Sequence, residues 1–240
     1  RLRLSPLTRW LCRRPAVRQV LTRDAFTARD LQDQGLNKAR FVGYPIMDPL
    51  GSQPPQAETL PAQPEPTAIA LLPGSRFPEA QANLVLLLHV CERLAQLAPE
   101  RPWLFEAAVV PGTSGPLLDQ QLVASGWQAC EAGLVKGALQ VSLRSDDFAG
   151  ILRRSRLVLG MAGTAVEQAV GLGKPVVQLV GGGPQFSYAF AEAQMRLLGE
   201  AVFTVGNRPA ATREIHSAAE LILQLLADAD LPQLCLQCGL

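Results

Sequence analysis

Short apolar runs alternate with longer amphipathic segments from residue 67 to residue 228. The apolar runs are rich in Val, Leu and Ala, which is typical of buried strands, and they cover residues 67–73, 103–111, 139–143, 156–160, 174–180 and 201–205. Between them, apolar residues recur at helical spacing and predict helices over residues 78–97, 115–126, 146–155, 164–173, 185–199 and 212–228. Parallel strands need crossover connections of this length. The pattern therefore predicts an α/β domain, with a parallel sheet and helices on both of its faces.

The start of the chain predicts a smaller strand–helix–strand unit. We expect strands over residues 16–22 and 39–45, with a helix over 23–36 that Asp24 caps and that ends near Gly35. A segment with six Pro and almost no periodicity follows and is typical of an extended linker. The predicted organisation is listed here: a first domain over 1–48, the linker over 49–66, a second domain over 67–228 and a tail over 229–240.

Composition excludes several classes of protein. A hydrophobic content of 48% suits a packed core, and a net charge of +1 with 5% aromatic residues gives no reason to expect a nucleic-acid partner. Five Cys are an odd number and argue against a disulfide framework, so we expect a reducing compartment, the cytoplasm. No apolar run is long enough for a membrane-spanning helix, and the Arg-rich start has no apolar segment behind it, as a signal peptide would.

The loops after the strands are where ligands bind in an open parallel sheet. In the loop 160–163, Gly160, Ala162 and Gly163 let backbone approach a ligand, and the helix that starts near Thr164 points its free N–H groups at the loop, as phosphate sites do. Glu167 lies one turn inside that helix and could accept hydrogen bonds from ribose hydroxyls. A capping box formed by Thr164 and Glu167 explains the same residues without any ligand. The G-x-G-x-x-G fingerprint does not fit here, which disfavours NAD.

The loop after the strand 67–73 contains Gly74, Ser75 and Arg76. Arg76 is a candidate for a fixed cation beside a diphosphate, because its guanidinium can bind two oxygens at once. The alternative is a solvated Arg76 in a turn, with Ser75 as a helix cap.

Three glycines precede Pro184 in a third loop, where backbone freedom is high. Its polar residues could hydrogen-bond a sugar; they are Gln185, Ser187, Tyr188 and Glu192. A hinge without chemistry would have the same sequence.

Other candidates carry weaker signals. His89 and His216 lie far apart in the sequence, and Cys235 and Cys238 have the spacing of a redox or metal pair but lack a second ligand pair. The first 23 residues contain seven Arg and no acidic residue, beside Leu4, Leu7, Trp10 and Leu11. That composition suits an anionic membrane surface, and a solvated basic face fits it equally.

Four segments together resemble the lipid-A-disaccharide synthase family, in particular its cyanobacterial-type members. They are TRDAFTARDLQDQG (22–35), VGYPIMD (42–48), LLPGSR (71–76) and AGTAVEQAVGLGKPVV (162–177). The last of these, with the Gly-rich loop, also looks like the donor site of the N-acetylglucosaminyltransferase of peptidoglycan synthesis. Both are GT-B glycosyltransferases, with two Rossmann-like domains that face a cleft.

The resemblance implies an inverting transferase that moves a sugar, expected to be N-acylglucosamine, from a UDP-sugar to a lipid-linked or glycolipid acceptor. It assigns Ser75 and Arg76, beside Gly74, to the diphosphate, Gly163 and Thr164 to the phosphate-facing helix start, Glu167 to the ribose and Gln185 to the donor sugar. No cofactor or metal is implied.

The resemblance also implies that residues 1–48 are the last part of an N-terminal domain. The chain has no initiator Met, so a fragment that lacks the catalytic base is expected. The rival functions are a UDP-sugar 2-epimerase of the same fold and a non-catalytic sugar-nucleotide-binding module. An epimerase would need carboxylates and a His close to the sugar C2, a cluster that these loops do not offer.

Overall fold

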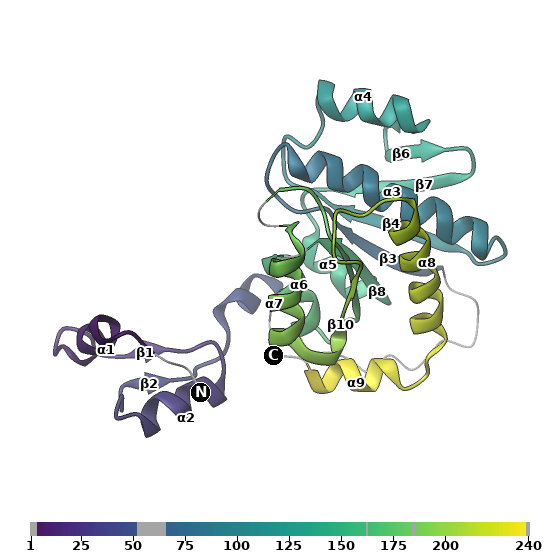
Figure 1. Cartoon of the computed structure of the whole chain (residues 1–240). Coiled ribbons are helices and arrows are strands. Elements are labelled where there is room, and N and C mark those ends of the chain that lie inside the picture. Colours follow the sequence, from purple (N-terminus) through teal and green to yellow (C-terminus); the bar gives the residue numbers. More distant parts are fainter. Residues whose placement is uncertain (1–3, 52–65, 162, 184–185, 239–240) are drawn as a thin grey trace. The chain divides into compact units, whose positions relative to one another are not determined.

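The computed structural model of the chain describes residues 4–51, 66–161, 163–183 and 186–238, with side chains as far as Leu236 (Figure 1). These residues belong to two compact units, which divide between Ser52 and Gln53. None of the helices in the described ranges is both long and apolar enough to span a lipid bilayer.

The first unit has the predicted strand–helix–strand order, preceded by a further helix. Its elements are α1 (Pro6–Arg13), β1 (Val20–Leu21), α2 (Ala25–Asp33), β2 (Ala39–Arg40) and the 3-10 helix η1 (Pro45–Leu50). β1 and β2 pair in parallel but are only two residues long each, so the predicted strands were too long. The predicted cap of α2 is confirmed, since the Asp24 carboxylate accepts a hydrogen bond from the Thr27 backbone N–H at 2.6 Å. α1 was not predicted, although Ser5 and Pro6 are ordinary helix-start residues.

The second unit is built on an eight-stranded sheet. Its strands are β3 (Thr67–Leu72), β4 (Trp103–Ala108), β5 (Gln128–Cys130), β6 (Gly133–Lys136), β7 (Leu139–Arg144), β8 (Leu157–Met161), β9 (Val176–Leu179) and β10 (Val202–Val205). The order across the sheet is β10-β9-β8-β3-β4-β7-β6-β5. The six strands from β10 to β7 pair in parallel, as predicted. β5 and β6 are antiparallel and were missed; they contain no continuous apolar run, and β5 is exposed at the sheet edge.

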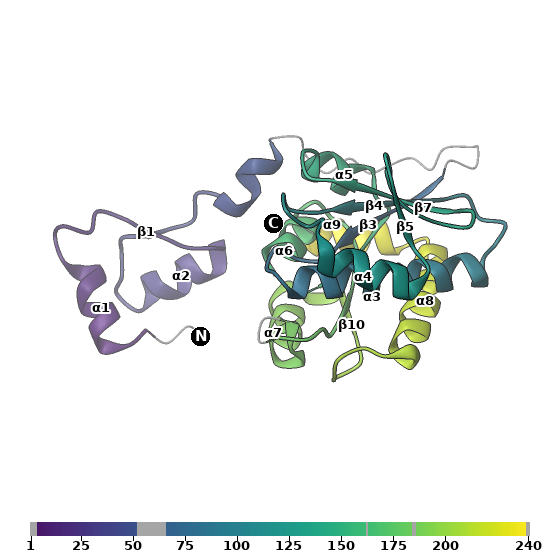
Figure 2. The same cartoon turned by 90° about the horizontal axis from the view of Figure 1, so that it is seen from above.

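Helices connect these strands. The ends of the predicted helices differ by at most two residues from the observed ends, except that α7 begins three residues later than predicted. They are α3 (Glu79–Leu97), α4 (Pro116–Ser125), α5 (Phe148–Arg154), α6 (Thr164–Gly171), α7 (Tyr188–Leu198), the 3-10 helix η3 (Gly199–Ala201), α8 (Thr212–Ala227) and the unpredicted α9 (Leu231–Cys238). α3 and α8 pack against each other on one face of the sheet, and α5 lies on the other face (Figure 2). The predicted α/β architecture with helices on both faces is confirmed.

The core of this unit lies at the centre of the sheet. Every residue of β3, β8 and β9 is buried, because helices cover both faces of these strands. Strands of this kind are continuous apolar runs rather than alternating ones, which is why the sequence revealed them. The bulkiest fully enclosed side chains of the unit are Trp127, just before β5, and Phe105 in β4.

Candidate functional site

The parallel strands have the order of a doubly wound sheet, and chain direction reverses beside β3. From β3 the chain moves outward through β4 to β7, and it then returns to place β8 on the other side of β3. Leu72 at the end of β3 lies opposite Gly160 in β8. The loops that follow β3 and β8 therefore start side by side, at the topological switch point where such sheets bind ligands. These are the first two loops that the sequence singled out.

α6 starts at this point with an unusual backbone conformation. Its N-cap is Gly163, with φ +148° and ψ −178°, a combination that suits glycine. A Cβ atom added to Gly163 would meet none of the described residues within 4 Å, so among those residues none crowds that side of the helix start. The buried side chain of Gln194, from α7, accepts from the Gly163 N–H at 3.0 Å and donates to the Gly163 carbonyl at 2.6 Å. A residue of another helix thus fixes the first turn of α6.

This geometry excludes the capping box that the sequence allowed. Thr164 is the first residue of the helix rather than its N-cap, and no side chain of an N-cap residue bonds to the first turn. Glu167 therefore stands one position beyond the place that a capping box requires. Thr164 is exposed and Glu167 is half-buried. The capping-box interpretation is wrong, and the phosphate-binding interpretation of the same residues stays a prediction.

The loop after β3 presents Ser75 and Arg76 to solvent. α3 begins only at Glu79, with Pro78 as its N-cap and no side-chain cap bond, so the alternative role of Ser75 as a helix cap is wrong. In the part of the chain that the structure describes, no carboxylate forms an ion pair with Arg76. Arg76 is thus a cation at the switch point without an internal partner.

The Gly-rich third loop folds onto the first one. Gly74 has φ +97°, and a Cβ atom there would approach Cζ of Phe186 to 2.9 Å. A Cβ atom on Gly181 would come within 2.7 Å of Oδ1 of Asn83. The Asn83 side chain is itself buried and donates to the Pro73 carbonyl at 2.9 Å. The structure therefore brings all three predicted loops together at one edge of the sheet, and glycines allow the close contacts between them.

The remaining predicted residues of the third loop give no test of a sugar site. Gln185 lies outside the described residues. Ser187 is the N-cap residue of α7, and Glu192 forms an ion pair with Arg196 at 2.7 Å one turn further along that helix. Their predicted contacts with a sugar stay predictions.

The weaker candidates lie away from this edge. His216 accepts from Nε of Arg93 at 2.7 Å where α8 packs on α3, and His89 lies 3.4 Å from Glu92 on α3. Cys235 is buried, and the side chain of Cys238 is outside the described part. Among the side chains that the structure describes, no group of three or more His, Cys, Asp or Glu could hold a metal ion.

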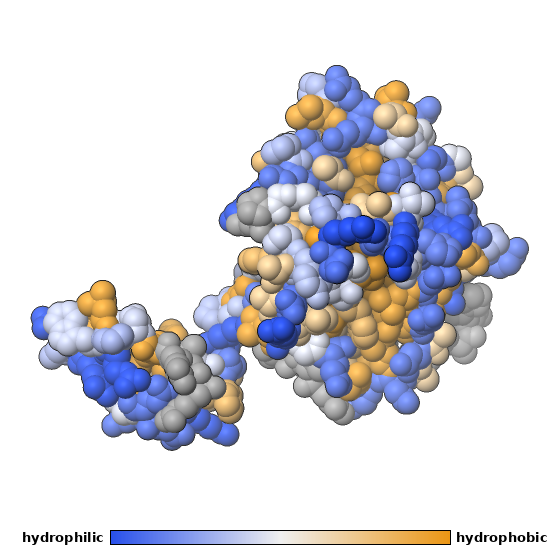
Figure 3. All heavy atoms as spheres, viewed as in Figure 1, coloured by the Kyte–Doolittle hydropathy of each residue, from blue (hydrophilic) through white to orange (hydrophobic). Residues whose placement is uncertain are grey.

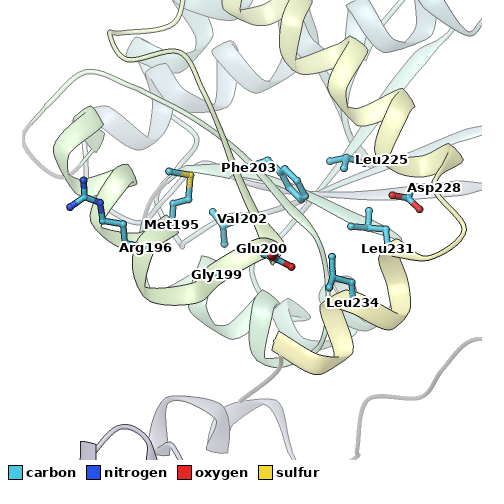
Figure 4. A pocket seen from close by; sticks show the side chains of 10 residues that line it. All are labelled: Met195, Arg196, Gly199, Glu200, Val202, Phe203, Leu225, Asp228, Leu231 and Leu234. Atoms are coloured by element: carbon cyan, nitrogen blue, oxygen red, sulfur yellow. The ribbon is translucent and has the colours of Figure 1, made fainter. Parts of the chain in front are cut away.

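Two cavities lie at the opposite edge of the sheet, where the parallel strands begin. One, of about 600 Å³, is mostly apolar and lies between the end of α7, the start of β10, and α8 and α9 (Figure 4). Apolar side chains also gather on the surface of this region (Figure 3). The other, of about 720 Å³, lies between α3 and the β6–β7 hairpin. Neither includes a residue of the three loops.

Sequence reasoning missed three residues that shape the site: Gln194, Asn83 and Phe186. Each acts on a backbone segment at least nine residues away in the sequence, so no local spacing marks it. The available signal was a polar amide on the apolar side of a helix, at Asn83 and at Gln194, which are 3% and 4% exposed.

No family model matches the chain. The lipid-A-disaccharide synthase of Pseudomonas putida is 33% identical over 150 residues, and that of Pseudomonas entomophila is 31% identical; each match covers 52% of this chain and 40% of the relative. The chain thus spans about two fifths of the length of these curated relatives.

Solved structures share the fold at low sequence identity. The UDP-GlcNAc 2-epimerase from Neisseria meningitidis bound to UDP-GlcNAc has a TM-score of 0.52 at 15% identity, covering 92% of this chain and 57% of that one. Staphylococcus aureus MnaA in complex with UDP has a TM-score of 0.53 at 13% identity, covering 92% and 55%. The chain is therefore a distant homologue of lipid-A-disaccharide synthases, and it has the α/β fold of about half of a GT-B-fold UDP-GlcNAc 2-epimerase.

Proposed function

We propose that the chain is the UDP-sugar-binding part of a glycosyltransferase similar to lipid-A-disaccharide synthase. It would transfer a sugar, N-acylglucosamine by the family resemblance, to a lipid-linked or glycolipid acceptor with inversion at the anomeric carbon. The observation that carries the proposal is that the loop with Arg76 and the loop before α6 begin side by side at the switch point, in a chain homologous to these synthases. The base that accepts the acceptor's proton would lie outside the residues described here.

Chemistry at this point would act on the leaving group. As the bond between sugar and diphosphate breaks, negative charge grows on the diphosphate. The N–H groups in the first turn of α6 and the helix dipole favour negative charge there, and Arg76 adds a full positive charge from the adjacent loop. The N–H groups of α6 are fixed by the helix, so stabilising the charge there would require little rearrangement. Ser75 would add a hydroxyl donor, and Gly74 leaves room for the backbone to approach.

Glu167 would recognise the ribose. It lies one turn inside α6 and is half-buried, and its carboxylate could accept from two neighbouring hydroxyls. Since the structure removes the capping box, a role for Glu167 in helix capping no longer competes with this assignment. Gln185 would face the donor sugar.

The basic start of the chain supports contact with an anionic membrane, where a lipid-linked acceptor would be found. Leu7, Trp10 and Leu11 lie on one side of α1 and are 65%, 55% and 48% exposed. Arg14 stacks its guanidinium on the Trp10 ring, with 4.9 Å between the guanidinium carbon and the ring centroid. An exposed apolar stripe beside arginines is the composition of helices that lie on anionic bilayers.

A UDP-sugar 2-epimerase is the second candidate, because solved structures with the same fold include such epimerases. An epimerase must remove and return a proton at carbon 2 of the sugar, a task suited to His or a carboxylate. The chain has two His: His216 contacts Arg93 where α8 packs on α3, and His89 lies beside Glu92 within α3. Neither His lies in the three loops, and the relatives found by sequence are lipid-A-disaccharide synthases. Both observations favour the transferase.

Titration of UDP into the chain by calorimetry tests the proposal. Arg76→Ala removes a charge-assisted contact, and UDP affinity should fall about 10- to 150-fold, which corresponds to about 1.5–3 kcal/mol. Arg156→Ala is the matched control, because Arg156 is also exposed but precedes β8 at the opposite edge of the sheet. Equal UDP affinity of wild type and Arg76→Ala would contradict the proposal.

Two further measurements separate its parts. Glu167→Gln should weaken UDP more than 2′-deoxy-UDP, because the deoxy compound lacks one hydroxyl that the carboxylate would accept from; the same ratio in variant and wild type would remove Glu167 from the site. In the full-length protein, release of UDP that depends on an added acceptor identifies a transferase. Conversion of the UDP-sugar without an acceptor identifies an epimerase.

A further inference from the structure

We propose that Gln194 is a positioning residue that holds the start of α6 open for the diphosphate. The inference rests on the proposed function. Gln194 lies on α7 and is 4% exposed. Its amide oxygen accepts from the Gly163 N–H at 3.0 Å, and its amide nitrogen donates to the Gly163 carbonyl at 2.6 Å. Both ends of one amide therefore bond to one residue, the N-cap of α6.

Helices usually satisfy their first turn locally. A Ser, Thr, Asp or Asn at the N-cap accepts from the N–H groups of the second or third helical residue, and a Glu or Gln at the third position bonds back to the N-cap N–H. In α6 the N-cap is Gly163, which has no side chain, and the third position is the apolar Val166. Gln194 takes over the second of these bonds from another helix.

Replacing a local cap by Gln194 leaves the first-turn N–H groups of α6 accessible to an anion. A local cap would place its own oxygen over the first-turn N–H groups, where a phosphate oxygen would have to lie. Gly163 has no side chain to cover that space, and a Cβ atom added to it would meet none of the described residues within 4 Å. Fixing the helix start from behind, through Gln194, keeps its order without covering it.

The bonds also restrain a residue that would otherwise move. Glycine has more backbone freedom than any other residue, and Gly163 has a conformation outside the usual regions of φ and ψ. Its carbonyl accepts from the Val166 N–H at 3.0 Å, which is the first hydrogen bond of the helix, and from Gln194 as well. Loss of Gln194 would therefore loosen the first turn of α6 and the N–H groups that would bind phosphate.

UDP titration of Gln194 variants tests the inference, with unfolding measured on the same samples. Gln194→Met keeps the shape and removes both bonds, and UDP affinity should fall about 5- to 30-fold, as expected when a site loses the order of one backbone residue. The matched control is Gln178→Met. Gln178 is a buried amide of β9 that donates to the Ala191 carbonyl of α7 at 2.9 Å but forms no hydrogen bond to Gly163. It should lower stability and leave UDP affinity within about twofold.

Gln194→Glu gives a readout that a merely structural role would not move. An ionised carboxylate accepts from the Gly163 N–H but repels its carbonyl, whereas a protonated carboxyl has one donor and one acceptor, as the amide does. Burial raises the pKa of a carboxyl, so the Glu introduced at position 194 should become protonated as the pH is lowered from about 8 to about 5. The UDP affinity of Gln194→Glu, relative to that of wild type at the same pH, should therefore recover over this range. This variant keeps the test decisive if Gln194→Met does not fold.

The outcomes distinguish this inference from the proposed function. If wild type does not bind UDP, both fail. If wild type binds UDP and Arg76→Ala weakens it, but Gln194→Met binds as wild type does, only the role of Gln194 is overturned. A Gln194→Glu affinity that stays at a constant fraction of wild type at every pH would overturn it too.

Discussion

Replacing Gly74 by Ala tests whether the third loop packs on the first as the structure has it. Two effects act on the new methyl group. Gly74 has φ +97°, a backbone conformation that residues with a Cβ atom adopt rarely, and the methyl carbon would lie 2.9 Å from Cζ of Phe186. Phe186 is 4% exposed, so its ring has little room to yield. The substitution therefore strains the backbone and also displaces a buried aromatic ring.

The size of each effect can be measured with two other glycines of the same unit. Gly182 has a φ outside the strained positive range, and an added Cβ atom there meets none of the described residues within 4 Å, so Gly182→Ala should change the unfolding free energy by at most about 0.5 kcal/mol. Gly199 has φ +75° and ψ −147°, and an added Cβ atom there meets none of the described residues within 4 Å, so Gly199→Ala isolates backbone strain of about 1–3 kcal/mol. Gly74→Ala adds the displaced ring and should cost about 2–4 kcal/mol.

Urea denaturation followed by circular dichroism measures the three free energies. For a unit of this size the Gly74→Ala loss corresponds to a fall in Tm of about 5–15 °C. If Gly74→Ala destabilises the protein no more than Gly199→Ala does, the ring of Phe186 does not lie against Gly74 in solution. The interlocked arrangement of the loops would then be wrong, whatever the nucleotide affinity.

Two predictions concern groups outside the loops. The Ala211 backbone N–H donates to the Glu214 carboxylate at 3.1 Å, and this bond holds the pKa of Glu214 below its usual value of 4.5. The ionised carboxylate therefore stabilises the fold above about pH 4.5, and this contribution is lost as the pH falls through the lowered pKa. Glu214→Gln should accordingly lose stability at pH 7 and less at pH 3 in urea titrations; an equal loss at both pH values would refute the assignment. Burial raises the pKa of the Cys91 thiol, whereas Cys130 is exposed on β5. A thiol reagent should therefore modify Cys130 in the native protein and Cys91 only after unfolding. Mass spectrometry of the labelled peptides measures both rates, and equal rates of labelling for the two thiols in the native protein would contradict this.

The central strands and the connecting helices were predictable because their burial requires apolar residues in a recognisable local pattern. β3, β8 and β9 are covered on both faces and so appear as unbroken apolar runs. β5 has no such pattern, since all three of its residues are exposed and only its pairing with β6 makes it a strand. α1 was missed for a similar reason: none of its residues is buried, so its hydrophobic pattern does not point to a core.

At the candidate site, topology predicted that two of the loops lie side by side, and residue spacing suggested a capping box that the structure does not contain. Ligand loops follow the strands of any parallel sheet, so the loops after β3 and β8 could be chosen in advance. Thr164 and Glu167 have the spacing of a capping box, but that motif depends on which residue is the N-cap, and the helix starts one residue too early for it. The actual restraint, Gln194, lies 31 residues from Gly163, and in the sequence it is one polar position of an amphipathic helix.

The same geometry explains why fold similarity alone does not choose between transferase and epimerase. Any reaction that separates a sugar from UDP must stabilise charge on the diphosphate, and under the proposed function the switch point between β3 and β8 would provide for that step in either enzyme. The reactions differ in what approaches the sugar: an acceptor hydroxyl at carbon 1, or a proton-transfer group at carbon 2. Under the proposed function the three loops would face the diphosphate, so they would serve both reactions alike. UDP binding therefore tests the site, and acceptor-dependent release of UDP by the full-length protein tests the reaction.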